Sequence, residues 1–211
     1  TTELGSGFRI AMRDLEIRGA GNLLGTGQSG HIAAVGYDLY CQMVNEAIAE
    51  LNGTEVRPLA EIKIEVPVAA NLPHDYVTRE DLRLDAYRRL AEVRSVADVD
   101  DIEAEWLDRY GPVPQEAAAL LGIARLRAEC VRTGITEVNV TVGSGLDGRR
   151  PTVHLRPLVL PTSKQMRLER LYKGAVVKKD REQVQLPLAR GVDIAAATVE
   201  ALQTIVPTDD E

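Results

Sequence analysis

A short stretch near the start of the chain combines glycines with long polar side chains, a composition that suits a loop binding phosphate groups. It runs from Arg13 to Gly30, reads RDLEIRGAGNLLGTGQSG and holds five glycines. Glycines let a backbone approach a ligand closely, and Arg18 and Gln28 can each donate several hydrogen bonds from one side chain. A phosphate-binding loop is therefore the first hypothesis to test.

Neither of two common nucleotide-binding templates fits this stretch. The residues from Gly25 to Gly30 match the letters G-x-G-x-x-G, but a dinucleotide loop follows a strand, and the residues before this one have helical spacing. The outer glycines also match a P-loop, but His31 and Ile32 occupy the places of its lysine and its Ser/Thr. The loop thus lacks the charge for the phosphates and the magnesium ligand. A connector rich in turn residues explains the glycines, but it explains neither Arg18 nor Gln28.

The composition predicts a soluble globular protein of one or two domains. The chain has 211 residues, of which 45% are hydrophobic and 27% charged, and its net charge is −7. No apolar run is long enough to span a bilayer and no signal peptide opens the chain, so we expect a cytoplasmic protein without a membrane partner. The missing initiating methionine suggests a fragment. The acid excess argues against a stand-alone nucleic-acid binder, whose affinity depends on neutralising phosphates.

The cysteines and histidines predict no metal site. Cys41 and Cys130 lie on predicted helical, apolar faces, where free thiols of a reducing compartment are usually buried. His31, His74 and His154 are far apart, with no cysteine or carboxylate at ligand spacing. We therefore expect two free, buried cysteines and no bound metal.

Hydrophobic spacing predicts helices in the first two thirds of the chain, interrupted by one strand. A helical apolar stripe runs over residues 39–51, and alternating apolar residues over 62–66 predict a strand. Three helices are expected next, over 79–94, from about 98 to 110, and from Pro114 to Gly134. The expected inward-facing residues of the second and third helices are Ile102, Trp106, Tyr110, Leu120, Leu121, Ala124, Leu126 and Val131.

Beyond residue 134 the apolar period changes to two, which predicts antiparallel β-structure. One hairpin is expected to join 138–142 to 153–155, and another to join 175–177 to 184–188. A helix over 163–172, capped by Thr162, should separate the hairpins, and a helix over 193–205 should close the fold.

The expected fold class is therefore mixed α/β (α+β), in two parts. Residues 1–54 form a helix-and-loop segment that contains the glycine-rich stretch. Residues 55–211 form a separate C-terminal domain of three helices, antiparallel β hairpins and a closing helix.

The glycine-rich stretch follows the pattern D-L-x-x-R-G-x-G-x-x-x-G-x-x-Q-S-G. Its fixed positions are Asp14, Leu15, Arg18, Gly19, Gly21, Gly25, Gln28, Ser29 and Gly30. In this it closely resembles the translocation motif shared by the RecG branch-migration helicases and the bacterial transcription-repair coupling factors. The later segments DLRLDAYRRLAEVRS and DRYGPVPQEAAALLGIARLR are similar to the C-terminal domain of the coupling factors alone. A segment of a RecG-like helicase is therefore the alternative.

The resemblance implies a role for each part of the chain. In these proteins two RecA-like motor domains bind ATP and Mg, and the motif couples ATP hydrolysis to movement along double-stranded DNA, with Arg18 and Gln28 as the coupling residues. The whole protein displaces stalled RNA polymerase and recruits nucleotide excision repair. Motor domains are absent from this chain, so the resemblance implies that the fragment alone has no catalytic centre and no cofactor of its own.

An acidic run in the second of the three helices is the other candidate site. Six carboxylates and no basic residue lie from Asp98 to Asp108, and Glu105 and Asp108 share a helix face because they are three residues apart. A solvated acidic face explains this run. The pattern E-x-x-D-R-[FY]-G, however, is that of the coupling factors, in which the two acids face arginines of the N-terminal domain. That domain recruits the repair protein UvrA, so the resemblance implies autoinhibition. A purely regulatory protein-interaction module is the remaining alternative.

A basic stretch from Lys164 to Arg181 has seven basic residues against two acidic ones. It is compatible with a contact to DNA or to RNA polymerase, although a solvated helix and hairpin is the simpler interpretation.

Overall fold

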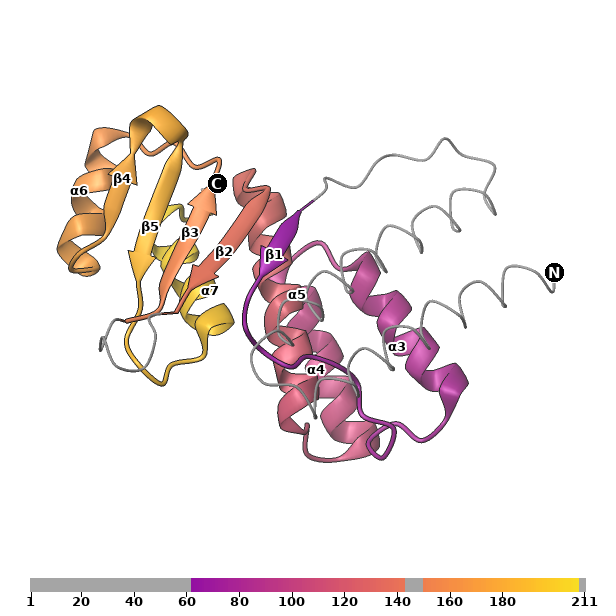
Figure 1. The fold of residues 1–211 in the computed structure, drawn as a ribbon. Coiled ribbons are helices and arrows are strands. Elements are labelled where there is room, and N and C mark those ends of the chain that lie inside the picture. Colours follow the sequence, from indigo (N-terminus) through magenta and orange to yellow (C-terminus); the bar gives the residue numbers. More distant parts are fainter. Residues whose placement is uncertain (1–61, 143–149, 209–211) are drawn as a thin grey trace, which may run out of the picture. The chain divides into compact units, whose positions relative to one another are not determined.

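The computed structural model describes residues 62–142 and 150–208 (Figure 1). The elements, in chain order, are β1 (Lys63–Glu65), α3 (Glu80–Glu92), α4 (Val96–Tyr110), α5 (Gln115–Thr133), β2 (Glu137–Thr141), β3 (Thr152–Arg156), α6 (Thr162–Leu171), β4 (Val176–Lys178), the 3-10 turn η2 (Lys179–Arg181), β5 (Gln183–Pro187) and α7 (Ile194–Ile205). The expected mixed α+β class is confirmed. The helix expected over 39–51 and the boundary expected at residue 54 lie outside the described residues.

The chain divides into two compact units. Among the described residues, one comprises residues 67–124, and the other comprises residues 62–66, 125–142 and 150–208. Residues 62–66 therefore belong with the later unit, although the chain passes through α3 and α4 before it returns there. Helix α5 contributes its first part to one unit and its second part to the other.

The described part of the first unit is helical. Helix α4 begins at Val96 because Ser95 and Asp98 form a capping box, in which each side chain accepts a hydrogen bond from the other residue's backbone N–H. It ends where Gly111 adopts a φ of 83°, a conformation that glycine adopts without strain. The core residues shared among these helices and the loop before them are Leu72, Val77, Ala86, Leu90, Val99, Ile102, Trp106, Leu120 and Leu121.

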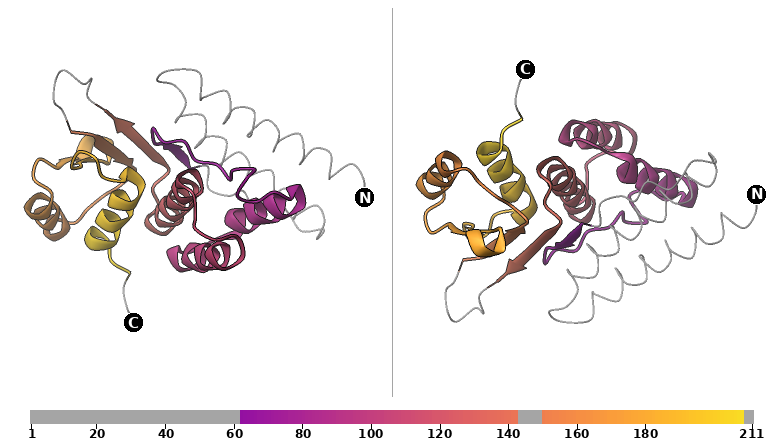
Figure 2. Two further views of the ribbon diagram at one scale, coloured as in Figure 1. Left: turned by 90° about the horizontal axis from the view of Figure 1, so that it is seen from below. Right: turned by 90° about the horizontal axis from the view of Figure 1, so that it is seen from above.

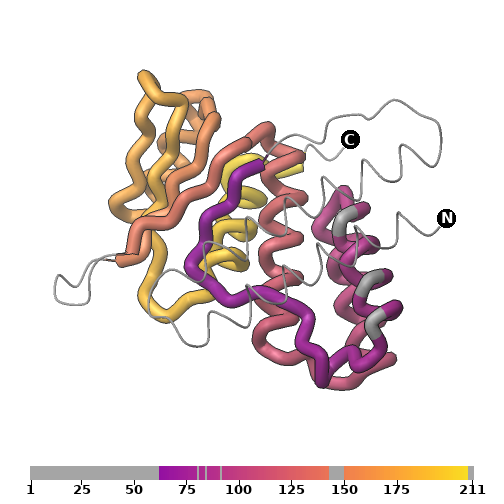
Figure 3. The backbone as a smooth tube through the Cα atoms, turned by 45° about the vertical axis from the view of Figure 1, so that its right-hand side comes forward, coloured from indigo at the N-terminus to yellow at the C-terminus, as the bar shows by residue number. Residues whose placement is uncertain are grey.

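The second unit is built on a five-stranded sheet of order β1-β2-β3-β5-β4. The pairs β2–β3, β3–β5 and β4–β5 are antiparallel, which confirms both expected hairpins. Strand β1 pairs in parallel with β2, with Ile64 opposite Val138; in Figure 3 the first coloured segment of the tube lies beside β2. Helices α6 and α7 cover the same face of this sheet (Figure 2). The buried residues on that side are Val138, Val153, Leu155, Leu168, Val184, Leu186 and Leu202.

Two details of the helices differ from the sequence expectation. Thr162 is not a cap, because it is the first residue of α6, and Pro161 precedes it without any side-chain capping bond. Helix α7, by contrast, has the side-chain cap that α6 lacks, because Asp193 accepts a hydrogen bond from the backbone N–H of Ala196 at 3.0 Å. The second difference lies in α5. Val131 was expected on the apolar face of α5, but 52% of its surface is exposed. Its neighbour Cys130 and the nearby Ile135 are buried, so Val131 lies on the solvent side of a helix that is still packed at this point.

Candidate functional site

The structure places only one of the two sequence-predicted sites. The residues of the translocation motif, from Asp14 to Gly30, lie outside the described residues, as does Cys41. Glu105 and Asp108 both lie on α4. The candidate site that the structure can describe is therefore the acidic face of α4.

The opposite face of α4 is anchored in the core. Val99, Ile102 and Trp106 are buried, and Trp106 is only 2% exposed. The hydroxyl of Tyr76 lies 3.2 Å from the carbonyl oxygen of Trp106 and 3.0 Å from that of Gly111, so it donates to the carbonyls at the end of the helix. The rings of Tyr76 and Tyr110 meet edge to face, with 5.7 Å between centroids. Both the position and the rotation of α4 are thus fixed.

Glu105 is bound on two sides by arginines of its own unit. Arg89 of α3 donates from Nη1 to Oε2 of Glu105, and Arg109 of α4 donates from Nη1 to Oε1 at 2.7 Å. The side chain of Glu105 is 30% exposed. These hydrogen bonds, that from Arg89 first and that from Arg109 second, lower the pKa of the Glu105 carboxyl. Glu105 therefore links α4 to α3, and the negative charge of its carboxylate is already compensated by arginines of its own unit.

Asp108 is in a different situation from Glu105. Its side chain is exposed on α4, and it makes no hydrogen bond or ion pair with any residue that the structure describes. The expected pair of equivalent acids is thus divided into two roles. Glu105 is a structural link between α3 and α4, whereas the carboxylate of Asp108 is exposed.

The remaining acids of the run also differ among themselves. Asp98 belongs to the capping box, and hydrogen bonds from the backbone N–H groups of Arg94 and Ser95 lower its pKa. Asp101 is exposed on the same helix. A largely solvated acidic face, which the sequence also suggested, remains compatible with this arrangement.

The roles of three residues at this site were not foreseen from the sequence. Arg89 reaches Glu105 from another helix, 16 residues earlier, and no local pattern indicates that pairing. Arg109 stands four residues after Glu105 on the same helix, and that spacing is a recognised signal for an ion pair. Tyr76 lies in the loop before α3, where its role depends on tertiary contacts alone.

The pH dependence of stability tests the role of Glu105. A pKa lowered by folding means that the ionised form stabilises the fold above the unfolded pKa of about 4.3, and this stabilisation is lost as pH falls through the lower folded pKa. Glu105→Gln should therefore reduce the free energy of unfolding by about 1 kcal/mol at neutral pH. The difference from wild type should shrink in acid below that pKa. Urea unfolding at several pH values measures it, and Asp101→Asn, which removes an exposed acid of the same helix, is the control. An equal, pH-independent effect of both substitutions would contradict the assigned role.

The described residues hold no metal cluster, no reactive cysteine and no helix that could span a membrane. No group of three or more His, Cys, Asp or Glu side chains there could hold a metal ion. Cys130 is buried, and its burial raises the pKa of its thiol to about 12, so it is not a reactive nucleophile at neutral pH. Within the same ranges, no helix has the length and apolar character needed to cross a membrane.

Comparison with known proteins identifies the family. Residues 66–146 match the TRCF domain family. The transcription-repair-coupling factors of Mycobacterium bovis and Mycobacterium tuberculosis are 42% identical over 214 residues, which cover 96% of this chain and 17% of theirs. That of Staphylococcus aureus is 42% identical over 137 residues, which cover 64% of this chain and 12% of its own length.

The fold agrees with the sequence comparison. A solved structure described as the C-terminal domain of transcription-repair coupling factor superposes with a TM-score of 0.53 at 13% identity, covering 69% of this chain and 89% of that one. At this identity the likeness speaks for the fold alone. The chain spans less than a fifth of the length of the curated relatives that it matches. It belongs to the transcription-repair coupling factors, as a counterpart of their C-terminal part.

Proposed function

We propose that this chain is the C-terminal portion of an ATP-dependent DNA translocase that displaces stalled RNA polymerase and recruits nucleotide excision repair in the cytoplasm. The observation that carries this proposal is the 42% identity to coupling factors over 96% of the chain. The aligned length is nearly the whole sequence, so it is not restricted to the C-terminal domain. A RecG-like helicase is less well supported, because residues 66–146 match the TRCF domain.

The proposed roles follow the two parts expected from the sequence. Residues 1–54 carry the translocation motif, in which Arg18 and Gln28 couple ATP hydrolysis to movement on double-stranded DNA. ATP and Mg bind to motor domains that are not part of this sequence, so this portion holds no catalytic centre. Residues 55–211 form the regulatory domain.

The regulatory domain acts by contacting the N-terminal, UvrA-recruiting domain of the same protein through the acidic face of α4. Two observations support this proposal. The core contacts and the hydroxyl of Tyr76 hold α4 in a fixed orientation. Asp108 is exposed, whereas Glu105 is already paired with Arg89 and Arg109. Asp108 is therefore the residue that engages a basic partner. Glu105 helps to hold α4 in place through its ion pairs with Arg89 and Arg109.

Reversing the charge of Asp108 tests this function. In the full-length protein, Asp108→Arg places like charges across the proposed contact, and loss of one partner of a desolvated charge pair costs about 2–5 kcal/mol. Coupling between regulated sites is about 1–3 kcal/mol, so the contact should open. Affinity for UvrA and the DNA-independent rate of ATP hydrolysis should both rise by at least about fivefold. Binding assays and steady-state ATPase rates measure the two effects.

The matched control is Asp101→Arg, which makes the same charge change at another exposed position of α4. Both variants should melt as the wild type does, because neither side chain is buried. If the melts agree and Asp108→Arg raises neither quantity above the level of the control, the acidic face is only a solvated surface.

A further inference from the structure

A row of cations lies on α6 and in the turn after it. It consists of Lys164, Arg167 and Arg170 on the helix and Lys173 in the turn that follows, and we call these four residues the basic stripe. Arg167, Arg170 and Lys173 are exposed, and Lys164 is partly exposed. None of the four pairs with an acid among the residues that the structure describes. The row lies within the stretch from Lys164 to Arg181, where basic residues outnumber acidic ones by seven to two.

Many basic side chains elsewhere in the described structure are engaged by acids. Examples are the pairs Lys63–Glu65, Arg79–Asp81, Arg88–Asp85, Arg89–Glu105, Arg132–Glu129 and Arg156–Glu137. In a chain with 32 acidic and 25 basic residues, pairing is the expected condition of a surface cation. A cluster of uncompensated cations is therefore a local departure from the acidic character of the whole.

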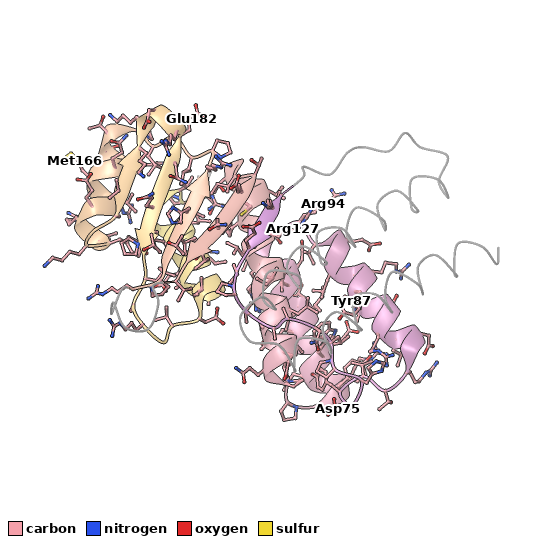
Figure 4. The ribbon with its side chains drawn as sticks, viewed as in Figure 1. Asp75, Tyr87, Arg94, Arg127, Met166 and Glu182 are labelled. Atoms are coloured by element: carbon pink, nitrogen blue, oxygen red, sulfur yellow. The ribbon has the colours of Figure 1, made fainter. Side chains whose placement is uncertain are left out.

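The helix arranges these charges along one side. Lys164, Arg167 and Arg170 are spaced by three residues, so successive side chains are neighbours on the helix surface. At 3.6 residues per turn, Glu169 is turned by about 160° from Arg167 and about 100° from Arg170, so it lies away from the middle of the stripe. Leu168 is completely buried and fixes the inward direction of α6. In Figure 4 the labelled Met166 projects from α6 away from the sheet, on the outer surface of the helix.

We propose that the basic stripe binds the phosphate backbone of duplex DNA without sequence preference. From Lys164 to Arg170 the helix rises about 9 Å, and phosphates follow one another by about 3.4 Å along the axis of each strand. The long side chains of the stripe can therefore reach two or three phosphates together. This contact is separate from the translocation motif, and it gives the C-terminal domain a DNA surface of its own.

The composition of the stripe favours DNA over an acidic protein surface. Protein interfaces are centred on buried aromatic and apolar anchors and are depleted in lysine. Here half of the stripe is lysine, and the exposed apolar residues beside it on α6 are Met166 and Leu171. Single-stranded nucleic acid requires exposed aromatic rings for stacking, and the only aromatic residue in this segment, Tyr172, is partly buried. Contacts to the phosphates of a duplex need neither feature.

Two triple variants of equal charge test the proposal on the whole chain. One is Lys164→Gln/Arg167→Gln/Arg170→Gln, and the control is Arg79→Gln/Arg88→Gln/Arg94→Gln, which removes three exposed cations of the other unit. Each changes the net charge from −7 to −10, since three positive charges are lost. Fluorescence anisotropy with a short labelled duplex, at salt concentrations from about 50 to 200 mM, measures affinity.

The wild-type chain should bind weakly, with a dissociation constant of about 10⁻⁴–10⁻⁶ M at physiological salt. The stripe variant should bind at least about tenfold more weakly than the control variant, and its slope of log affinity against log salt should be smaller by up to about 2.7, or 0.9 for each lost phosphate contact. Two duplexes of unrelated sequence should behave alike.

Equal affinities and equal slopes for the two variants would overturn the proposal, because any binding would then depend on net charge or on another part of the chain. Loss of binding to polyglutamate in the stripe variant, with binding to DNA equal in both variants, would overturn it in favour of an acidic protein partner. The single substitutions Arg167→Gln and Arg170→Gln provide a second series if the triple stripe variant does not fold. Each should lose less affinity than the triple variant, because it removes one cation, and an affinity unchanged by either substitution would also refute the proposal.

Discussion

The full-length protein carrying Arg18→Ala should continue to hydrolyse ATP but should fail to displace stalled RNA polymerase. The reason is that the proposed role of Arg18 is coupling and not nucleotide binding. A guanidinium group can exchange one set of charge-assisted hydrogen bonds for another between nucleotide states, and the neighbouring glycines allow the backbone to follow. Alanine keeps the chain conformation accessible but provides no donors. The expected result is therefore a near-complete separation of the two activities.

The measurements are ATP hydrolysis in the presence of DNA and release of a stalled elongation complex by the same preparation. Arg13→Ala is the matched control, since Arg13 lies in the same segment but precedes the first fixed position of the pattern. Gln28→Ala should behave as Arg18→Ala does. Normal polymerase displacement by the Arg18 variant would show that the motif has been assigned wrongly.

Replacing Trp106 by alanine should produce the largest loss of stability within the described domain. Trp106 is 2% exposed and is among the largest completely enclosed side chains, and truncating a buried Phe or Trp to alanine costs about 3–5 kcal/mol. A domain is stable by only about 5–15 kcal/mol, so α4 should lose its fixed position even where the chain remains folded. In the full-length protein, the DNA-independent ATPase should then rise as it does in Asp108→Arg.

The neighbouring residue provides the control for Trp106. Leu107 is 55% exposed, and Leu107→Ala should change the free energy of unfolding by less than about 0.5 kcal/mol. Chemical denaturation of both variants compares them directly. If Trp106→Ala lowers stability as expected but the ATPase of the full-length protein does not change, the acidic face of α4 has no restraining role.

The helices and hairpins were predictable because their signals are local. The apolar period and Gly111 after α4 are contained in short stretches of sequence, whereas the cap at Ser95, which starts α4 two residues before the expected position, was not predicted. Where a local signal was weak, the prediction was wrong, as at Thr162, which lies inside α6. Val131 illustrates a different limit: spacing shows that a position can face the core, but the extent of the core depends on the elements packed there.

The site was predictable only in part, for a related reason. The acidic run identified Glu105 and Asp108, and their spacing placed them on one face. The difference between them depends on Arg89, which belongs to another helix and becomes a neighbour only after α3 and α4 have packed. The parallel pairing of β1 with β2 was not foreseen either, because the two strands are separated in sequence by three helices.

That pairing has a consequence for the nascent protein. Glu65 and its hydrogen-bond partner Asn139 are 74 residues apart, and ribosomes add about 5–20 residues per second. Strand β1 is therefore synthesised about 4–15 s before β2 exists to receive it. During that interval Ile62, Ile64 and Val66, all buried in the finished fold, have no partner strand. An apolar segment with unpaired backbone groups is prone to aggregation, so we expect this segment to be the one that holdase chaperones recognise on the growing chain.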